Sequence, residues 1–570
     1  MRILTQSEYD AFAKELNDAN LSLEGKDEKV ANAYKLVEKD IYLIGATIVE
    51  DKLQDKVPET IRDLRLAGIK IWMLTGDKMN TAYNIGLSCN LINKDLKTFQ
   101  LEGIEVKKNE KMEVINKEER DQVILNFAKE YNKYKGEFDS MTKVQFGILV
   151  DEKALLTINQ DEDIQTIFLN IAKDAVAVIC CRVSPLQKSQ VVKMMKAYDK
   201  KAITLAIGDG GNDVSMIMEA HIGIGIYGEE GMRAVQSGDY AIGEFKILHR
   251  LLLFHGRINY LRNSELVLYF FYKNFVFTMI QFIYGFYNNF SGQTIIDDWF
   301  ITLFNLLFTS LPLGVRACLD IDVRPEDGTI IQKMQPFLYS EMRSNPKFTH
   351  LTFGLTLLKG TIHCMINYFY VVYVHEEHSI DDDGHIGGLW FVSVNMFTNI
   401  LLIVTLDLIV YTKYETWINW VILGIITGLA YAIFLIIVHY CVIFNSVATM
   451  AVAFASPSLW LTIIFVGGTC FAIDFILYSF NFNFRSTMAN MLQKRVSQGN
   501  LSEEDLPDII KEKLALYDVY KGEKQIEADP VTILNSDRSK KNTDEVSKVK
   551  LEGDHSKKIS LELEENKLKE

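Results

Sequence analysis

The sequence predicts an α/β domain built on a doubly wound parallel sheet, followed by an all-α bundle of six transmembrane helices. Three observations lead to this prediction. Strand-like and helix-like patterns alternate through the first 245 residues, long apolar runs occupy residues 266–480, and the sequence becomes polar and charged from about residue 483. At 570 residues the chain is too long for a single compact core, so several domains are expected.

The first half of the chain alternates strand patterns with helix patterns. Residues 41–52 (IYLIGATIVEDK) form an apolar, β-branched run that ends in acidic residues, which is typical of a strand entering a loop. Pro58 then opens a helical pattern that Gly68 ends, and residues 69–78 (IKIWMLTGDK) form the next strand pattern. Further strand patterns lie at 144–152, 175–183, 201–209 and 222–226. In such sheets chemistry gathers at the carboxyl ends of the strands.

Polar turns follow three of these strands. They contain Thr75, Gly76, Asp77 and Lys78, then Arg182 with Lys188 nearby, then Asp209 to Asp213. Asp209 and Asp213 offer the carboxylates that Mg²⁺ takes from proteins, and the glycines around them allow a tight turn. Asn212 and Thr75 can hydrogen-bond to a phosphoryl group, and Lys188 can neutralise its charge, as phosphoryl transfer requires. Solvated turns of an ordinary α/β protein are the alternative, but they do not need these side chains to converge.

Six apolar runs approach or exceed the length of about 20 residues that spans a bilayer. They lie near 266–288, 299–319, 350–374, 389–411, 417–444 and 457–480. The segments after the first, third and fifth runs contain no Lys or Arg, whereas the segments on the opposite side are basic. This alternation places both termini in the cytosol by the positive-inside rule. Buried helices of a soluble protein, the alternative interpretation, do not produce it.

Polar residues inside the runs are costly, about 3 kcal/mol for a charge at the membrane centre, and usually face the bundle interior or a transport path. Lys273 and Asn274 lie in the first run and Asn305 in the second, so these three are candidate path residues. Structural pairing with a neighbouring helix is the alternative for Lys273. Asp407 and Asp474 are weaker candidates, because snorkelling or local pairing can satisfy them.

Composition argues against several functions. A net charge of −14 disfavours a general nucleic-acid surface. The seven cysteines include no CxxC pair, which argues against a zinc site or a disulfide framework. The first 20 residues contain no apolar signal-peptide core and are typical of the middle of a helical domain.

Several motifs resemble those of a known family. TGDK (75–78) and GDGGNDVSM (208–216) are similar to signatures of the P-type ATPases, whose phosphorylation domain has the haloacid-dehalogenase-like fold, a Rossmannoid α/β architecture. EDKLQDKVPETI (50–61), CRVSPLQKSQVV (181–192) and the span sequences within 271–323 resemble the phospholipid-flippase branch, type IV, more than the cation pumps. The resemblance covers about residues 35–485.

The resemblance implies roles for the matching residues. Asp209 and Asp213 would hold Mg²⁺, and Lys273 would correspond to the fifth-span lysine implicated in passing the lipid head group. The ATP and phosphoryl site would be lined by Thr75, Gly76, Asp77, Arg182, Lys188, Asn212 and Asp213. The implied reaction is ATP hydrolysis through an aspartyl phosphate, coupled to phospholipid movement toward the cytosolic leaflet. A glycosylated accessory subunit is the expected protein partner.

The sequence departs from the family at the nucleophile. The family uses the aspartate of a DKTGT motif, and no DKTGT occurs in these 570 residues. Most of the nucleotide-binding domain, the actuator domain and the first four of ten spans are also expected to be missing, and the sheet is expected to lack its central strand. A non-catalytic half-transporter that binds or regulates a partner flippase is therefore the alternative function. A cation pump is disfavoured, because the first two runs place no acidic ligand at mid-membrane.

The domain boundaries follow from these patterns. We predict a remnant of the nucleotide-binding domain (1–40), an incomplete phosphorylation domain (41–245), a stalk (246–265), a six-helix membrane domain (266–482) and a cytosolic tail (483–570). Helices are expected in the tail to about residue 530 and disorder from about 535, where charge is mixed and aromatic residues are few. The sequence does not distinguish the plasma membrane from endomembranes.

Overall fold

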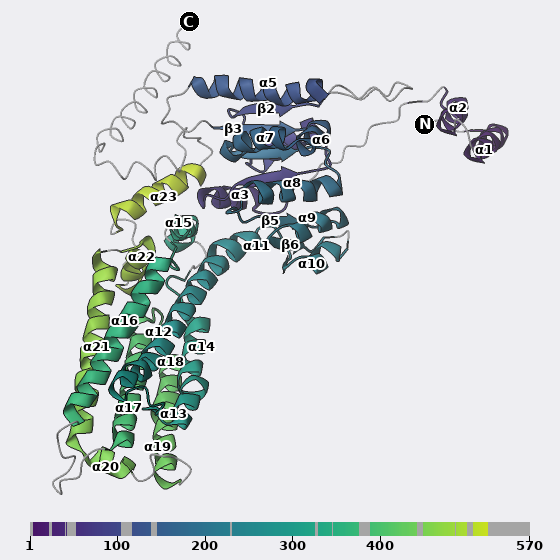
Figure 1. Cartoon of the computed structure of the whole chain (residues 1–570). Coiled ribbons are helices and arrows are strands. Elements are labelled where there is room, and N and C mark those ends of the chain that lie inside the picture. Colours follow the sequence, from purple (N-terminus) through teal and green to yellow (C-terminus); the bar gives the residue numbers. More distant parts are fainter. Residues whose placement is uncertain are drawn as a thin grey trace. The chain divides into compact units, whose positions relative to one another are not determined.

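A computed structural model describes most of the chain (Figure 1). The described residues are 4–21, 26–39, 42, 53–103, 117–137, 145–228, 231–324, 329–344, 346–375, 388–441, 449–484, 486–498 and 506–521. The chain divides into two units, Met1–Leu53 and Gln54–Glu570. The predicted strand at 41–52, apart from residue 42, and the predicted disorder after 535 lie outside the described residues.

The first unit contains a pair of helices, α1 (Gln6–Leu21) and α2 (Lys26–Val37). The two helices pack on each other, and the rings of Phe12 and Tyr34 lie 5.7 Å apart between their centroids. The segment predicted as a remnant of a nucleotide-binding domain is thus helical in its described part.

The second unit begins with an α/β region whose named strands form two separate sheets. The first has the order β1 (Ile71–Leu74), β4 (Ala177–Cys180), β3 (Phe146–Val150) and β2 (Lys97–Leu101). The second has the order β5 (Leu205–Gly208), β6 (Ile222–Ile226) and β7 (Tyr240–Ile242). Every strand pair is parallel, with Ile71 opposite Ala177 in one sheet and Leu205 opposite Ile222 in the other. The parallel pairing agrees with the predicted α/β class, but a single continuous sheet is not present among the described residues.

Helices connect these strands in the alternating order that the sequence predicts. They are α3 (Val57–Leu66), α4 (Met79–Ser88), α5 (Lys117–Gly136), α6 (Glu152–Gln160), α7 (Glu162–Asp174), α8 (Pro185–Tyr198), η1 (Gly211–Asp213), α9 (Val214–Glu219) and α10 (Arg233–Ser237). Helical crossovers of this kind are the usual way to join parallel strands, which cannot be linked by a tight hairpin.

The strands next to the break between the two sheets are less buried than the central strands. Strands β3 and β4 are buried along their whole length, whereas β1 is half-buried throughout and β5 is half-buried at three of its four residues. Each of β1 and β5 has one strand neighbour among the described residues. Ile71 of β1 and Ile207 of β5 nevertheless pack against the same hydrophobic cluster, which contains Leu64 and Ile224. The two sheets are therefore near neighbours that share a core but no ladder of hydrogen bonds.

The rest of the second unit is helical. Its longest continuous helix combines α11 (Ile247–His249), the π-helical segment η2 (Arg250–Gly256) and α12 (Arg257–Tyr287). The following elements are α13 (Asp298–Leu303), the π-helical η3 (Phe304–Thr309), α14 (Ser310–Leu319), α15 (Ile330–Ser344), α16 (His350–His375), α17 (Leu389–Tyr411), α18 (Trp417–Ile422), the π-helical η4 (Leu423–Ala430), α19 (Tyr431–Tyr440), α20 (Thr449–Ala455) and α21 (Pro457–Phe484).

Five helices among the described residues are long and apolar enough to cross a membrane. They are Ile247–Tyr287, Asp298–Leu319, Leu389–Tyr411, Trp417–Tyr440 and Pro457–Phe484. The sequence predicted six, and the sixth run is also a helix, α16, of 26 residues. Helix α16 falls outside the five because polar residues interrupt its apolar sequence, among them Lys359, His363 and Asn367. Each of these residues has a partner on another helix: Lys359 pairs with Asp407 and Asp474, His363 contacts Tyr272, and Asn367 donates to the Met396 carbonyl.

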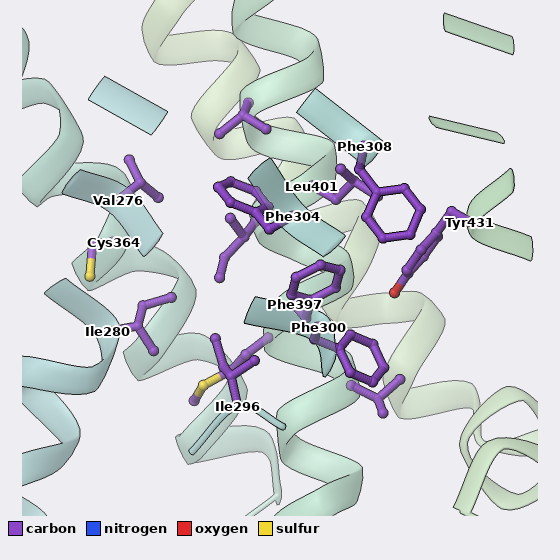
Figure 2. Packing of buried hydrophobic residues seen from close by; sticks show 14 of the residues in the cluster. Val276, Ile280, Ile296, Phe300, Phe304, Phe308, Cys364, Phe397, Leu401 and Tyr431 are labelled. Atoms are coloured by element: carbon purple, nitrogen blue, oxygen red, sulfur yellow. The ribbon is translucent and has the colours of Figure 1, made fainter. Parts of the chain in front are cut away.

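Aromatic side chains fill the centre of the helical bundle (Figure 2). Phe300, Phe304 and Phe308 come from the second span and surround Phe397 of α17, with Tyr431 of α19 beside them. The Phe300 and Phe397 centroids are 4.8 Å apart in an edge-to-face arrangement, which aromatic quadrupoles favour. This packing fixes the second span, and with it Asn305 and Thr309, against its neighbours.

The beginning of the predicted cytosolic tail is helical and packed. Helices α22 (Met488–Ser497) and α23 (Asp508–Lys521) share a hydrophobic cluster with α15 and with Leu66 of α3. Arg62 donates to the Tyr517 hydroxyl at 2.8 Å, and Lys333 pairs with Asp518 at 3.0 Å. The predicted helices of the tail are therefore present as far as the structure describes it.

A buried ion pair connects α12 to the segment after α14. Arg257 donates to both carboxylate oxygens of Asp322 at 2.6 and 2.8 Å, and the two side chains are 2% and 3% exposed. Burial alone would raise the pKa of Asp322, but the charge and hydrogen bonds of Arg257 lower it. A lowered carboxyl pKa contributes stability above the ordinary value of about 3.9, and that contribution is lost as pH falls through the folded pKa.

We predict that Arg257→Leu lowers the free energy of unfolding by about 3–5 kcal/mol, because it leaves a buried carboxylate without its cation. The control is Lys173→Leu, which removes a lysine that is 61% exposed and lies 3.5 Å from Asp199. That exposed pair contributes about 0–1 kcal/mol. Thermal unfolding of both variants in detergent at neutral pH provides the comparison. Equal melting temperatures for the two variants would contradict a stabilising role for the Arg257–Asp322 pair.

Candidate functional site

Two of the predicted site turns are joined by backbone hydrogen bonds. Thr75, at the end of β1, donates from Oγ1 to Asp77 Oδ2 at 2.7 Å and accepts from the Asp77 amide at 3.1 Å. The Arg182 amide, just after β4, donates to the Asp77 carbonyl at 2.9 Å, and the Val183 amide donates to the Thr75 carbonyl at 3.0 Å. The carboxyl ends of β1 and β4 therefore present one continuous polar edge.

Arg182 adopts an uncommon backbone conformation at this edge. Its φ is 54°, in the left-handed region that non-glycine residues occupy rarely. Such strain costs about 1–3 kcal/mol and gathers at ligand-binding and catalytic sites. The conformation turns the chain from β4 toward Ser184, which caps α8. Ser184 and Gln187 form a reciprocal capping box with Pro185 at the first helical position.

The third predicted turn contacts the second through an ion pair. Lys188 of α8 donates from Nζ to Asp213 Oδ1 at 2.8 Å, with both side chains largely buried. Ser215 Oγ donates to the Pro185 carbonyl at 2.8 Å, which ties α9 to the start of α8. Residues on the two separate sheets, Lys188 after β4 and Asp213 after β5, are thus held together at one place.

Gly208 is required by the close approach of Asp213. A Cβ on Gly208 would lie 2.4 Å from the Asp213 Cβ and 2.5 Å from its Oδ2, closer than carbon atoms approach in folded proteins. Any side chain at position 208 would push Asp213 away from Lys188. The glycine predicted to allow a tight turn is therefore needed for contact rather than for backbone conformation.

The remaining predicted residues lie at the same edge without forming the same contacts. Gly76, Asp209 and Asn212 are exposed, and within the described part of the chain neither Asp209 nor Asn212 donates or accepts a side-chain hydrogen bond. Asp209 packs against Gly228, where a Cβ would lie 3.2 Å from the Asp209 Cβ. The backbone of Gly76 and the side chains of Asp209 and Asn212 are therefore accessible to a ligand from solvent.

The carboxylates fit Mg²⁺ as a pair rather than as a closed cage. No group of three or more His, Cys, Asp or Glu side chains that could hold an ion is present among the described residues. Mg²⁺ commonly takes one or two protein carboxylates and completes its shell with water and phosphate oxygens, so Asp209 and Asp213 suit it in number and chemistry. Asp213 also forms an ion pair with Lys188.

Sequence reasoning did not single out Asp151 and Cys181. Asp151 directly follows β3, and Cys181 follows β4, so both lie at the same edge as Thr75 and Asp77. Burial, together with the nearby charges of Asp151 and Asp77, raises the pKa of the Cys181 thiol to about 11. Cys181 therefore remains a protonated thiol at neutral pH. The signal that identifies Asp151 is its position as the first acidic residue after a buried strand.

The helical bundle contains a second candidate site around Lys273. Its Nζ donates to Asn305 Oδ1 and to Thr309 Oγ1, each at 2.6 Å, and the side chain is buried. The rings of Phe270 and Phe304 lie 5.3 and 5.4 Å from the same nitrogen. The structure thus brings the predicted residues Lys273 and Asn305 together. Asn274 is half-buried, and within the described part of the chain its side chain forms no hydrogen bond.

The partners of Lys273 lie on a locally widened helix. Segment η3 is π-helical, and Thr309 Oγ1 donates to the Phe304 carbonyl at 2.8 Å. Pro312, one turn later, has no amide hydrogen to continue the regular ladder, which accounts for the irregularity before it. Segments of this kind occur mostly at functional sites. Thr309 was missed from the sequence, although it lies four residues after Asn305 on the same helix.

The weaker candidates Asp407 and Asp474 belong to a different cluster. Lys359 of α16 forms ion pairs with Asp407 of α17 and, at 3.3 Å, with Asp474 of α21. His363 Nε2 lies 3.8 Å from Asp474, and its Nδ1 is 2.6 Å from the Tyr272 hydroxyl. Both aspartates are therefore paired locally with Lys359, as one of the two sequence-based interpretations expected. The cluster joins three helices and adjoins α12 one residue before Lys273.

We predict that Lys359→Met destabilises the bundle by about 3–5 kcal/mol, because it leaves two buried carboxylates facing each other. The double variant Lys359→Met/Asp407→Asn should recover part of this loss. Thr361→Val is the matched control, since Thr361 bonds only its own helix, at the Leu357 carbonyl. Thermal unfolding in detergent provides the measurement, and a double variant no more stable than the single one would contradict the ion-pair account.

Comparison with known proteins gives one family. Residues 235–487 match the family described as phospholipid-translocating P-type ATPase C-terminal. The chain is 39% identical over 422 residues to phospholipid-transporting ATPase IH of Homo sapiens, covering 73% of this chain and 37% of that protein. It is 40% identical over 435 residues to probable phospholipid-transporting ATPase IM of Homo sapiens, covering 74% and 36%. It is 38% identical over 487 residues to phospholipid-transporting ATPase ID of Mus musculus, covering 82% and 39%.

The chain is a membrane protein related to the P-type ATPases. More narrowly, it belongs with the phospholipid-transporting branch, and its residues 235–487 carry that family's C-terminal region. The resemblance inferred from the sequence motifs is thereby confirmed. The chain spans 36–39% of the length of the three relatives named above.

Proposed function

We propose that this chain provides the ATP- and Mg²⁺-handling loops and the lipid path of a phospholipid flippase, in which ATP hydrolysis drives phospholipid toward the cytosolic leaflet. The observation that carries the proposal is the Lys188–Asp213 contact, at 2.8 Å, because it brings together two loops that phosphoryl transfer requires. The relatives' names supply the transported class, phospholipid.

In this proposal the polar edge binds the nucleotide phosphates. Thr75, the Gly76 amide and Asn212 donate to phosphoryl oxygens, Lys188 neutralises their charge, and Asp77 and Arg182 fix the loop and contact the nucleotide. Asp209 and Asp213 hold Mg²⁺, which supplies charge neutralisation on the phosphoryl group when bound. The two sheets would form one haloacid-dehalogenase-like sheet once a strand lies between β1 and β5. In the family that strand carries the DKTGT aspartate, a motif these 570 residues do not contain.

We predict that Asp209→Asn reduces Mg²⁺-dependent phosphoenzyme formation about 100-fold or more, because a neutral amide binds Mg²⁺ poorly. The test uses a chimera in which the preceding region of a phospholipid-transporting ATPase, with its DKTGT motif, is joined to this chain. Incorporation of ³²P from labelled ATP is measured. The control is Asp95→Asn. Asp95 is an exposed carboxylate before β2, away from the carboxyl ends of the strands, and it forms no side-chain hydrogen bond or ion pair among the described residues. Unchanged phosphorylation in Asp209→Asn would remove the Mg²⁺ assignment.

The lipid path in this proposal runs past Lys273. A buried ammonium whose partners are the neutral groups of Asn305 and Thr309 can exchange them for the phosphate or carboxylate of a lipid head group. Asn274 and Asn305 are the neighbouring path residues. Because the partners lie on the π-helical η3, a local change in that helix can release the lysine.

We predict that Lys273→Ala lowers lipid-stimulated ATP hydrolysis about tenfold or more in the same chimera while reducing phosphoenzyme formation less. A path residue acts in the lipid-dependent steps, whereas a structural residue affects every step. Thr278→Ala is the control, since Thr278 is exposed on the same helix and bonds only the Asn274 carbonyl. Equal losses of hydrolysis and phosphorylation would mean that Lys273 is structural.

The membrane topology belongs to the same proposal. We include α16 as a sixth span, since it packs against α12, α17 and α21 and pairs its lysine with aspartates of two spans. Both termini then lie in the cytosol, on the side of the basic segments. A glycosylated accessory subunit is the proposed protein partner. The absence of a DKTGT motif favours one alternative, a non-catalytic half-transporter that binds or regulates a partner flippase; ATPase activity appearing only on co-expression with such a partner would identify it.

A further inference from the structure

A cavity lies where the α/β region joins the helical bundle. It has a volume of about 310 Å³ and is open to solvent. Its lining comes from four places in the chain: the π-helical η2, the first part of α12, the end of α14 with the segment after it, and the segment between α17 and α18. The lining residues are Arg250, Phe254, Arg262, Cys318, Leu319, Ile321, Arg324, Tyr414 and Thr416.

Three arginines line this cavity, and no carboxylate does. Arg250 and Arg324 are exposed, and among the described residues neither forms an ion pair with Asp or Glu. Arg262 donates from Nε to the Asp320 carbonyl at 2.6 Å, a contact that fixes the side chain without neutralising its charge. Three uncompensated guanidinium groups around one cavity repel each other and attract an anion.

The carboxylates near this cavity in sequence are engaged elsewhere. Asp320 is buried and accepts the amides of Lys413 and Tyr414 through Oδ1, each at 2.9 Å. Asp322 is held by Arg257, as described above. Glu415 lines a separate, much smaller cavity beside Pro312 and Asn419. Among the described residues, these carboxylates lie outside the cavity lining, and the three arginines are its charged groups.

The remaining walls of the cavity are apolar and lie at the end of the membrane helices. Leu319 is the last residue of one candidate span, and Thr416 immediately precedes another. Phe254, Leu319 and Ile321 add an apolar surface next to the arginines. A ligand that matches this combination carries a phosphate in the head-group region of the bilayer and an acyl chain beside it. Basic pockets between helices at this depth bind anionic lipid head groups.

We propose that this cavity binds the phosphate of an anionic phospholipid, at a site separate from Lys273. Arg250 and Arg324 contact the phosphate oxygens, Arg262 supplies a third positive charge from the cavity wall, and Phe254 with Leu319 contacts the first part of the acyl chain. A guanidinium fork can bind two phosphate oxygens at once, which suits arginine better than lysine for this role. The site requires neither ATP nor the transport reaction.

The test measures binding to the full 570-residue chain in zwitterionic nanodiscs. Dioctanoyl phosphatidic acid is the probe, and dioctanoyl phosphatidylcholine and inorganic phosphate are compared with it by intrinsic fluorescence and thermal shift. We expect saturable binding of phosphatidic acid, weakened about fivefold by Arg250→Gln or Arg324→Gln alone and about 30-fold by both together. Arg495→Gln, which removes the same charge outside the cavity, should leave the affinity unchanged. Arg250 and Arg324 are exposed and form no ion pair among the described residues, so the variants are expected to fold, and their melting temperatures without lipid check this.

Each outcome decides the proposal. Loss of affinity in the double variant, together with unchanged affinity in Arg495→Gln, supports a built lipid site. Wild-type affinity in the double variant overturns it, as does an equal loss in Arg495→Gln, which would indicate diffuse surface charge. Inorganic phosphate that competes as strongly as the lipid would mean that the cavity recognises a free anion rather than a phospholipid. Failure of ATPase activity in a chimera has no bearing on this result.

Discussion

Polar groups inside the helical bundle must find partners within the protein, because the hydrocarbon of a bilayer offers none. This constraint decides which helix lies beside which. Lys359 connects α16 to α17 and α21 through two aspartates, and Lys273 connects α12 to the second span through Asn305 and Thr309. Aromatic packing around Phe397 fills the space between them. Without these polar pairings, apolar helices of similar sequence would have several equivalent ways to pack.

The same requirement for partners acts on the backbone of the α/β region. Strand β1 pairs only with β4, and β5 only with β6. Among the described residues, no strand pairs with the other edge of either one. Parallel strands are normally covered on both edges and both faces. Ile71 and Ile207 on a common hydrophobic cluster show that the two sheets are already aligned by side-chain packing.

Local features of this protein could be predicted from the sequence, and long-range features could not. The turns after β1, β4 and β5 follow from strand patterns and glycines, so Thr75, Asp77, Lys188 and Asp213 could be assigned to one edge. Lys273 and Asn305 stand out as polar residues in apolar runs. The pairing of Lys359 with Asp407 and Asp474 depends on contacts 48 or more residues apart, which no local pattern encodes. The division into two sheets depends on which strands pair with each other. Asp151 becomes a candidate site residue only because it lies at the same sheet edge as Thr75 and Asp77.

The continuous helix from Ile247 to Tyr287 can transmit a movement at one of its ends to residues far along it. At 1.5 Å per residue, the 26 steps from its first residue to Lys273 correspond to a rigid arm of about 39 Å. A tilt of about 5° at the end next to the α/β region would move the lysine by about 3 Å, the length of one hydrogen bond. Small angular displacements at the start of this helix would thus make or break the contact between Lys273 and Asn305.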